Sequence, residues 1–340
     1  MQRHRATVSV GFVTGMLSGL NHRDVDAEQL LHSLGMSTEG ILNPRVRMPI
    51  DQYVKLYNLV VRSLDDEGFG LFSSPLRLGT FEFLCRSVLS SATLEEALDR
   101  ASRFLRIVLP ELAVSVTRGR ATALIEIAEI LPLRERKDDP CRVFAFEWLL
   151  RLLHGLSCWL VGRGLQLNSV TFPFPKPPHA ADYSLIYTQH SGFNSRSLVV
   201  SLTPNLLDLP IRRDEDALSV FLKDAPGKIT MLYRRDRETV RRVRDMVAVN
   251  LSLPNSIEEV ANKLHVSART LHRRLQEEGS SFRAIKDAVR RDFALSRLEK
   301  TRQSVERIAT DLGYSEPSAF FRAFQSWTGT APSKYRKRLA

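Results

Sequence analysis

Apolar residues in the last quarter of the chain, at about 253–335, follow one short pattern that occurs twice. In each copy they recur at positions i, i+3, i+4 and i+7, the spacing that lines one face of a helix. The first copy consists of Ile257, Val260, Ala261 and Leu264, and the second of Val305, Ile308, Ala309 and Leu312. After a short break, at 265–267 or 313–315, a second helix begins. Two helices joined by so tight a turn form a helix-turn-helix, whose second helix is shaped to enter a DNA groove.

Polar residues at the expected helix starts support this interpretation. Ser256 with Glu259 is typical of a capping box, in which side-chain oxygens accept hydrogen bonds from backbone N–H groups. Ser267 and Ser315 occupy the places where the second helices need an N-cap, and Pro317 suits a first helical turn. The offset between the copies is 48 residues up to the turns and 49 across the second helices, so one residue is inserted just after Ser315. We therefore expect helix-turn-helix motifs at about 256–277 and 304–327.

The second helix of each motif is expected to bury one stripe of side chains and to expose the opposite one. The buried stripes are Leu271 and Leu275 in the first motif, and Phe320, Phe324 and Trp327 in the second. The exposed faces carry the residues that we expect to read base edges: Arg269, His272 and Arg273, then Ser318, Phe321 and Arg322, with Gln276 and Gln325 extending the same faces. An arginine suits guanine, and a phenylalanine ring suits the methyl group of thymine. A phosphate contact is the alternative role of His272.

Basic residues off these faces are expected to have simpler roles. Arg274, Arg290 and Arg291 are predicted to be solvated on a helix surface. A helix at about 236–251 carries Arg234, Arg235, Arg237, Arg241, Arg242 and Arg244 on or near its outer side, where they contact either phosphate or solvent.

The helix between the motifs, at about 281–301, supplies a length scale. At ~1.5 Å per residue it spans roughly 30 Å, close to the ~34 Å of one turn of B-DNA. A rigid helix of that length holds two recognition helices in successive major grooves. One chain is therefore expected to read a site of about two helical turns.

The first 210 residues have a different pattern. Helices are expected at 24–64, 93–108 and 142–160, the second with Thr93 and Glu96 as a capping box. Alternating apolar residues at 112–116 and 123–127, joined by a turn at 118–120, predict a β-hairpin, and further strands are expected at 169–174 and 197–202. This order predicts an α+β domain in which helices cover a small sheet.

These patterns divide the chain into three parts. Residues 1–210 form the α+β domain, 211–235 a polar linker, and 236–340 an all-α domain with the two motifs. The apolar stretch at 8–20 is short and interrupted by glycines, so it is not a convincing signal peptide or membrane span. The protein is expected to be soluble and cytoplasmic, without membrane contact.

The net charge of +11 is concentrated in the C-terminal domain. From residue 228 onward there are 24 Lys and Arg against 13 Asp and Glu, whereas the preceding residues have 25 of each. Such a distribution is typical of a protein that neutralises DNA phosphates. A solvated basic surface is the simpler alternative, but it does not account for the repeated motif in the same segment.

Nothing in the sequence predicts an enzyme or a cofactor. The chain has no P-loop lysine, no G-x-S-x-G, no H-E-x-x-H and no Cys or His metal spacing. Cys85, Cys141 and Cys158 are scattered and odd in number, which fits buried thiols in a reducing compartment. His154, His179 and His190 are interpreted as satisfied polar groups or surface residues. We therefore expect no catalytic residues, no metal and no cofactor.

The C-terminal residues resemble a known family. The segments VSARTLHRRLQEEGSSF, AVRRDFALSRL and IATDLGYSEPSAFFRAFQSWTGTAPSKYR are similar to the DNA-binding domain of the AraC/XylS family of bacterial transcription regulators. The resemblance covers about a hundred residues. It implies DNA contact from the same two faces, with Arg273 at a position that is an arginine in relatives, and it implies RNA polymerase as a partner and activation rather than repression.

The N-terminal residues have a weaker but extended resemblance. The segments LEEALDRASRFLRIV, VTFPFPKPPHAADYSLIY and SLVVSLTPNLLDLPI are similar to the arabinose-binding-like domain of regulators of the ornithine-utilisation-regulator class. The resemblance implies a domain that binds a small effector, forms a homodimer, or does both. The alternative is that this domain is solely a dimerisation or protein-interaction module without a ligand.

Overall fold

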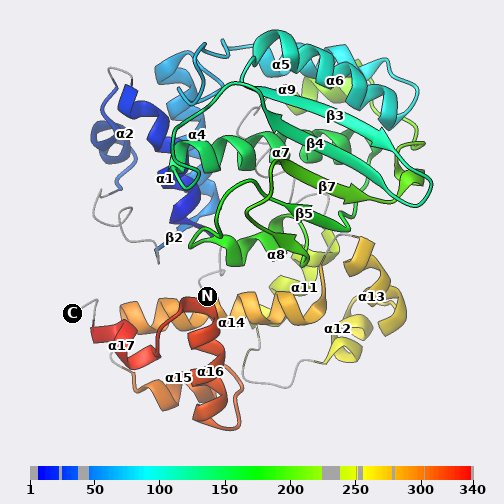
Figure 1. Cartoon of the computed structure of the whole chain (residues 1–340). Helices are drawn as coiled ribbons and strands as arrows, with labels where there is room; N and C mark the ends of the chain where they lie inside the picture. The colour runs from blue at the N-terminus through cyan, green and yellow to red at the C-terminus, as the bar shows by residue number, and fades with distance from the viewer. Residues whose placement is uncertain are drawn as a thin grey trace. The chain divides into compact units, whose positions relative to one another are not determined.

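The chain divides into two compact units (Figure 1). The computed structural model describes residues 7–22, 25–36, 46–223, 238–249, 251, 256–277, 280–301 and 303–337. One unit spans residues 5–236, and the other is built mainly from residues 237–340. The first combines helices with a sheet, and the described regular elements of the second are all helices, which confirms the predicted fold class.

A five-stranded sheet forms the frame of the first unit. Its strands are β3 (Leu112–Arg118), β4 (Ala123–Glu129), β5 (Ser169–Thr171), β6 (Ser191–Gly192) and β7 (Leu198–Leu202), in the order β3-β4-β7-β5-β6. Neighbouring strands are antiparallel except β5 and β6, which are parallel. The predicted hairpin is confirmed, since Leu112 pairs with Glu129 and Arg118 with Ala123. A separate antiparallel pair joins β1 (Thr7–Ser9) to β2 (Arg47–Pro49).

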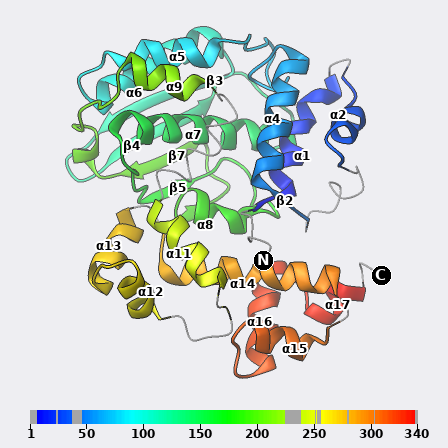
Figure 2. The same cartoon turned by 180° about the vertical axis from the view of Figure 1, so that it is seen from behind.

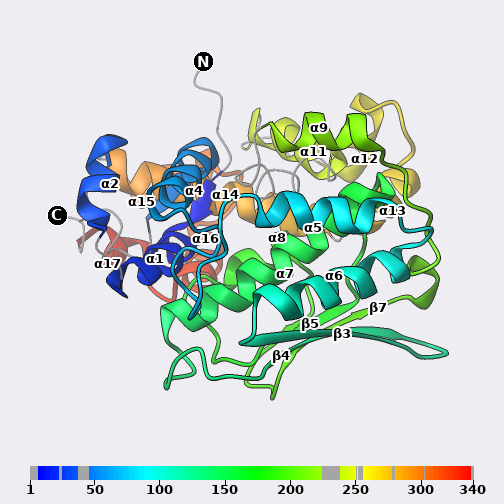
Figure 3. The same ribbon diagram turned by 90° about the horizontal axis from the view of Figure 1, so that it is seen from above.

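Helices α6 and α7 cover one face of the sheet (Figure 3). The described helices of the unit are α1 (Val10–Ser18), α2 (Ala27–Ser33), α4 (Ile50–Leu64), α5 (Thr80–Leu89), α6 (Leu94–Val108), α7 (Pro140–Val161), α8 (Tyr183–Ile186) and α9 (Glu215–Leu222), with short 3₁₀ turns η1 (Gly19–His22), η2 (Ala180–Asp182) and η3 (Pro204–Leu206). On β3 the burial alternates, because Leu112 and Val114 face the core whereas Ser115 and Thr117 face solvent.

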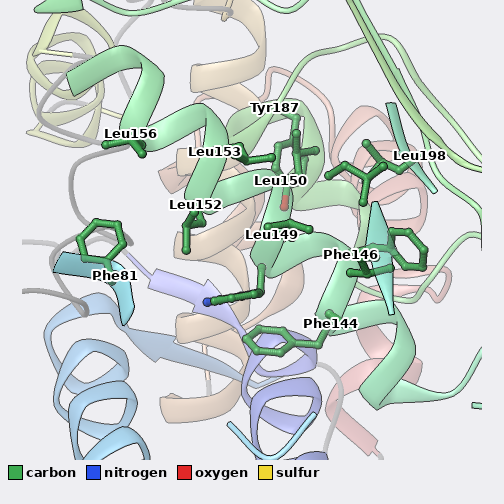
Figure 4. Packing of buried hydrophobic residues seen from close by; sticks show 14 of the residues in the cluster. Phe81, Phe144, Phe146, Leu149, Leu150, Leu152, Leu153, Leu156, Tyr187 and Leu198 are labelled. Carbon is green, nitrogen blue, oxygen red and sulfur yellow. The ribbon is translucent and has the colours of Figure 1, made fainter. Parts of the chain in front are cut away.

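Helix α7 is the centre of the core, and every residue from Cys141 to Val161 is buried. Figure 4 shows its side chains, among them Phe144, Leu149 and Leu152, leaving the helix in several directions toward neighbouring elements. Among the described helices, α7 alone is long and apolar enough to cross a membrane, and its most apolar stretch is entirely buried inside the unit. A helix whose apolar residues are spread around its circumference, rather than along one stripe, is expected at such a position.

The N-terminal apolar stretch forms β1 and α1 and packs against α7. A Cβ atom on Gly11 would lie 2.2 Å from the His179 ring, and one on Gly15 would lie 2.6 Å from Phe144. Glycine at these positions therefore lets α1 approach its neighbours closely.

Two expectations for this unit need correction. Thr93 caps α6 by accepting from the Glu96 N–H, but the Glu96 carboxylate accepts from Ala92 instead of completing the capping box. Residues 215–222, expected in the linker, form helix α9. Leu218 and Phe221 are buried there, and Phe221 stacks on Trp159 of α7 at 4.5 Å between ring centroids, so this part of the range belongs to the first unit.

The second unit is arranged around one long helix. Its described helices are α11 (Glu238–Val249), α12 (Ile257–Lys263), α13 (Ala268–Glu277), α14 (Phe282–Lys300), α15 (Val305–Asp311), α16 (Pro317–Thr328) and α17 (Pro332–Lys337). Ser281 caps α14 and Thr301 ends it, as the sequence predicts. Figures 1 and 2 show α12 and α13 toward one end of α14 and α15, α16 and α17 toward the other. A single apolar core joins them.

Candidate nucleic-acid interface

The first helix-turn-helix is built from α12 and α13. The predicted capping box is present: Ser256 Oγ accepts from the Glu259 N–H at 3.2 Å, and the Glu259 carboxylate accepts from the Ser256 N–H at 3.4 Å. Ser267 caps α13 by accepting from the Thr270 N–H at 3.1 Å, also as predicted. His265 turns the chain between the helices with a φ of 55°, in the left-handed region. Local hydrogen bonds therefore define both helix starts.

The second helix-turn-helix, α15 and α16, repeats this turn with a glycine. Gly313 has a φ of 73°. Its N–H donates to the Thr310 carbonyl and that of Tyr314 donates to Ala309, and the same two bonds occur 48 residues earlier in the first motif. The repeat seen in the sequence is thus a repeat of backbone geometry.

The start of α16 differs from expectation. Its N-cap is Glu316, which makes no side-chain capping bond, and Pro317 occupies the first turn as predicted. The prediction that Ser315 caps the helix is wrong because the inserted residue precedes the cap position, so Ser267 corresponds to Glu316 at an offset of 49. The Glu316 carboxylate instead accepts from Ser318 Oγ at 3.2 Å.

The recognition helix of the first motif, α13, has the predicted division into two faces. Leu271 and Leu275 are buried in the core of the unit. The opposite face is exposed and consists of Arg269, His272, Arg273 and Gln276. Arg274, beside this face, is also exposed, as expected.

The recognition helix of the second motif, α16, is less polar. Phe320 and Phe324 are buried, whereas Trp327 is only half-buried against the core. Three of the predicted reading residues, Ser318, Arg322 and Gln325, are exposed. Phe321 is half-buried, with its ring 6.3 Å from that of Phe320. The second face therefore has one exposed cation and part of an aromatic ring where the first face has two arginines and a histidine.

Arginines that we predicted to be solvated hold α14 in place instead. The Arg290 guanidinium lies 4.5 Å from the centroid of the Tyr314 ring, and its Nη2 donates to the Gly313 carbonyl at 3.4 Å. This contact joins α14 to the turn of the second motif. Solvation of Arg290 is therefore the wrong expectation, and no spacing in the sequence reveals the contact, because Tyr314 is 24 residues away.

A second contact joins α14 to α11. Arg244 Nη2 lies 2.5 Å from Asp292 Oδ2, and both side chains are mostly buried. Arg291 is buried beside them, with its Nε 3.6 Å from Asp292 Oδ1. Arg244 and Arg291 are therefore structural. Arg242 on α11 is exposed, whereas Arg234, Arg235, Arg237 and the side chain of Arg241 lie outside the described residues.

Burial also perturbs titratable groups along this part of α14. It raises the pKa of the Tyr314 hydroxyl and of the Asp287 carboxyl, and it lowers the pKa of the Lys286 ammonium. All three shifts have the sign expected when water is removed from the charged form. The middle of α14 is therefore packed against its neighbours rather than fully solvated.

Candidate catalytic and metal-binding groups of the first unit are engaged in the core. Across the described residues, no group of three or more His, Cys, Asp or Glu side chains is placed to hold a metal ion. The three cysteines are free and buried, and burial raises the pKa of the Cys141 thiol to about 11. His154 Nε2 is 2.8 Å from the Leu165 carbonyl, and His179 Nε2 is 2.6 Å from Glu147 Oε1. These contacts agree with the interpretation of the two histidines as satisfied polar groups.

Two family models match the chain. Residues 25–211 match the N-terminal arabinose-binding domain of AraC transcription regulators, and residues 260–338 match a helix-turn-helix domain. The Ornithine utilization regulator of Pseudomonas aeruginosa is 27% identical over 333 residues, which are 97% of this chain and 96% of that protein. The HTH-type transcriptional regulator VqsM of the same species is 38% identical over 293 residues, which are 83% of this chain and 87% of that protein.

Solved structures include the transcriptional regulator CdpR from Pseudomonas aeruginosa, at 22% identity over 93% of this chain and all of that one. Its TM-score of 0.33 supports no further conclusion. The family models and the two sequence relatives, in contrast, agree with both halves of the structure. The chain belongs to the AraC family of helix-turn-helix, DNA-binding transcription regulators.

Proposed function

We propose that a single chain reads a DNA site of about two helical turns by placing α13 and α16 in successive major grooves. The observation that carries this proposal is the pair of exposed polar faces on two recognition helices joined by α14, a helix of 19 residues. At ~1.5 Å per residue α14 spans roughly 28 Å, against about 34 Å for a turn of B-DNA.

The exposed side chains of both recognition helices contact the base edges. Arg269 and Arg273 have the fork geometry that pairs with guanine, and His272 either joins them or contacts a phosphate. On α16, Arg322 takes the role of Arg273, and Ser318 supports it. The exposed part of the Phe321 ring suits a thymine methyl group, and Gln276 and Gln325 suit adenine.

The first unit supplies regulation. We propose that this unit, which includes α9, forms a homodimer and responds to a small effector. The protein then acts as a cytoplasmic activator that contacts RNA polymerase. Support comes from the family, from buried unlinked thiols, which fit a reducing compartment, and from the burial of α7.

Changing the spacing between the two half-sites tests whether one chain binds both of them. After footprinting locates a site, 5 or 10 base pairs are inserted between its halves, and affinity is measured by fluorescence anisotropy. Both insertions are expected to reduce affinity to that of one half-site, because a rigid α14 cannot lengthen. Unchanged affinity with the 10-base-pair insertion, which preserves the helical phase, would show that the two halves are bound by separate chains.

A further inference from the structure

The start of α16 carries a carboxylate that the helix itself does not use. Glu316 is the N-cap residue and is exposed, but its side chain makes no capping bond. Pro317 follows at the first helical position, and a proline restricts the residue before it to extended backbone. Glu316 accordingly has a φ of −129° and a ψ of 133°. The backbone therefore places this carboxylate at the start of a recognition helix, where side chains of a helix-turn-helix contact base edges.

Ser318 adds a second oxygen at the same place. Its hydroxyl donates to Glu316 Oε2 at 3.2 Å. Because that proton is used by the carboxylate, the Ser318 oxygen can only accept further bonds, and Glu316 keeps the rest of its lone pairs. Among the described residues, no basic side chain forms an ion pair with Glu316. Glu316 and Ser318 therefore form an exposed group of acceptors, which we call the acceptor pair.

The first motif has different chemistry at the corresponding place. Ser267 takes the position of Glu316, and its oxygen caps α13 by accepting from the Thr270 N–H at 3.1 Å. The Thr270 hydroxyl oxygen lies 2.8 Å from the same atom. The Ser267 hydroxyl is therefore engaged within its own helix. The exposed face of α13 presents mainly donors, from Arg269 and Arg273, whereas α16 begins with acceptors.

The four bases differ in what they offer to a carboxylate in the major groove. Cytosine presents an amino group without an acceptor, whereas adenine presents an acceptor beside its amino group. Guanine and thymine present acceptors. Opposite either of these two bases, the carboxylate would lose water without gaining a hydrogen bond. Cytosine is therefore the base that suits the acceptor pair.

We propose that Glu316, oriented by Ser318, is a specificity-determining residue that selects cytosine in the half-site bound by α16. The proposal rests on the placement of α16 in a major groove proposed above, and it assigns one base to that groove. Arg322 follows Ser318 by four residues, about one helical turn, so a guanine bound by Arg322 lies near the cytosine. The two half-sites therefore differ in sequence, and the difference gives the chain one orientation on its DNA.

The negative charge of Glu316 by itself opposes binding to any duplex, because phosphates carry the same sign. A residue that only repelled phosphates would lower affinity equally for every sequence. A residue that selects cytosine instead penalises the other bases more than it penalises cytosine. Removal of the charge without a change of side-chain shape therefore distinguishes the two roles.

The Glu316→Gln variant makes that change. Full-length wild-type protein and the variant are each used to select duplexes from a library that is randomised across the footprinted site. The wild type is expected to prefer cytosine at one position by at least about fivefold, the lower end of the range for a base contact. The variant is expected to prefer adenine at that position, because an amide pairs with adenine N6 and N7.

Glu306→Gln is the matched control. Glu306 is exposed in the first turn of α15, so this variant removes the same charge from the same motif but outside the recognition helix. It is expected to keep the wild-type base preference. An unchanged preference in Glu316→Gln, or a gain in affinity that is equal on all duplexes in anisotropy titrations, would overturn the proposal.

Glu316→Asp provides a second test with the charge retained. The shorter side chain withdraws the carboxylate from the groove, and an aspartate at an N-cap accepts bonds from the first-turn N–H groups. The cytosine preference is therefore expected to weaken, and a full preference in this variant would contradict the proposed contact. The half-site insertions described above do not depend on which base Glu316 selects. Failure of two-groove binding is thus distinguishable from failure of the cytosine contact.

Discussion

Arg273 and Arg322 occupy corresponding places on the two recognition helices, and both are exposed. Their neighbours differ, because Arg273 lies among other polar side chains whereas Arg322 follows the half-buried Phe321. An exposed arginine on such a helix serves either a base edge or a phosphate. Only the first role distinguishes one DNA sequence from another.

Replacement of either arginine separates these two roles. Arg273→Ala and Arg322→Ala are each expected to reduce specific operator binding by about 1–3 kcal/mol, the usual worth of a bidentate contact to guanine, while non-specific binding changes little. Anisotropy titrations with operator and random duplexes provide the measurement. Arg283→Ala is the control, since that side chain is 93% exposed and belongs to α14 rather than to either recognition helix. Equal losses on both duplexes would assign the arginines to phosphates.

The arginines show how far residue type alone predicts a role. Helical spacing placed Arg269, Arg273 and Arg322 on exposed faces, and the structure confirms that exposure. The same reasoning failed for Arg244, Arg290 and Arg291. An arginine on the outer side of a single helix becomes buried when another helix packs there. The residues next to it in sequence do not indicate that packing.

At the scale of elements, the two turns of the repeat use different residues for one backbone shape. Gly313 adopts its φ of 73° without cost, whereas His265 adopts 55° with a side chain present. Asn, Asp and His tolerate this region better than most residues. The first turn is therefore the more strained of the two.

Gly313→Ala is expected to lower the free energy of unfolding by about 1–2 kcal/mol, because alanine is strained in the left-handed region. Urea denaturation followed by circular dichroism measures the change. Ser315→Ala is the neighbouring control and is expected to have little effect, since Ser315 does not cap α16. A large loss in the Ser315 variant, or none in the Gly313 variant, would contradict this account of the turn.

The contact of Arg290 with Tyr314 and Gly313 orients the second motif relative to α14. Arg290→Met is expected to cost about 0.5–2 kcal/mol of stability, the usual range of a cation–π contact, and to let the protein accept half-sites one base pair closer or farther apart. Stability is measured by urea denaturation, and spacing by selection from a library of spacer lengths.

Arg297 provides a matched control for this variant. Its guanidinium lies 4.8 Å from the Phe293 ring, but both residues belong to α14. Arg297→Met therefore removes a similar contact without releasing the second motif, and it is expected to leave the preferred spacing unchanged. If the preferred half-site spacing changes in both variants, or in neither, Arg290 does not orient the second motif.

At the scale of the whole molecule, charge is divided unevenly between the units. The excess of +11 lies from residue 228 onward. If the second unit neutralises 6–10 phosphates, affinity for random duplex DNA is expected to fall by about 10³- to 10⁵-fold between 50 and 200 mM salt. Titration over a salt series measures the slope. The Arg273→Ala, Arg322→Ala double variant should keep that slope, and a slope lower by about two would mean that both arginines bind phosphate.

The sequence by itself determined many, though not all, of the elements of this protein. Apolar spacing defined α12 to α16, local capping residues defined most of their starts, and alternation defined the β3–β4 hairpin. These features depend on neighbours within about four residues, or on alternation along a strand, so a single sequence contains them.

Only the tertiary structure decided which side chains meet across long separations. The contacts of Arg290 with Tyr314, of Arg244 with Asp292 and of Phe221 with Trp159 join residues 24 to 62 positions apart. Such meetings depend on how whole elements pack to bury their apolar faces, and that packing is a property of the complete chain rather than of any one segment.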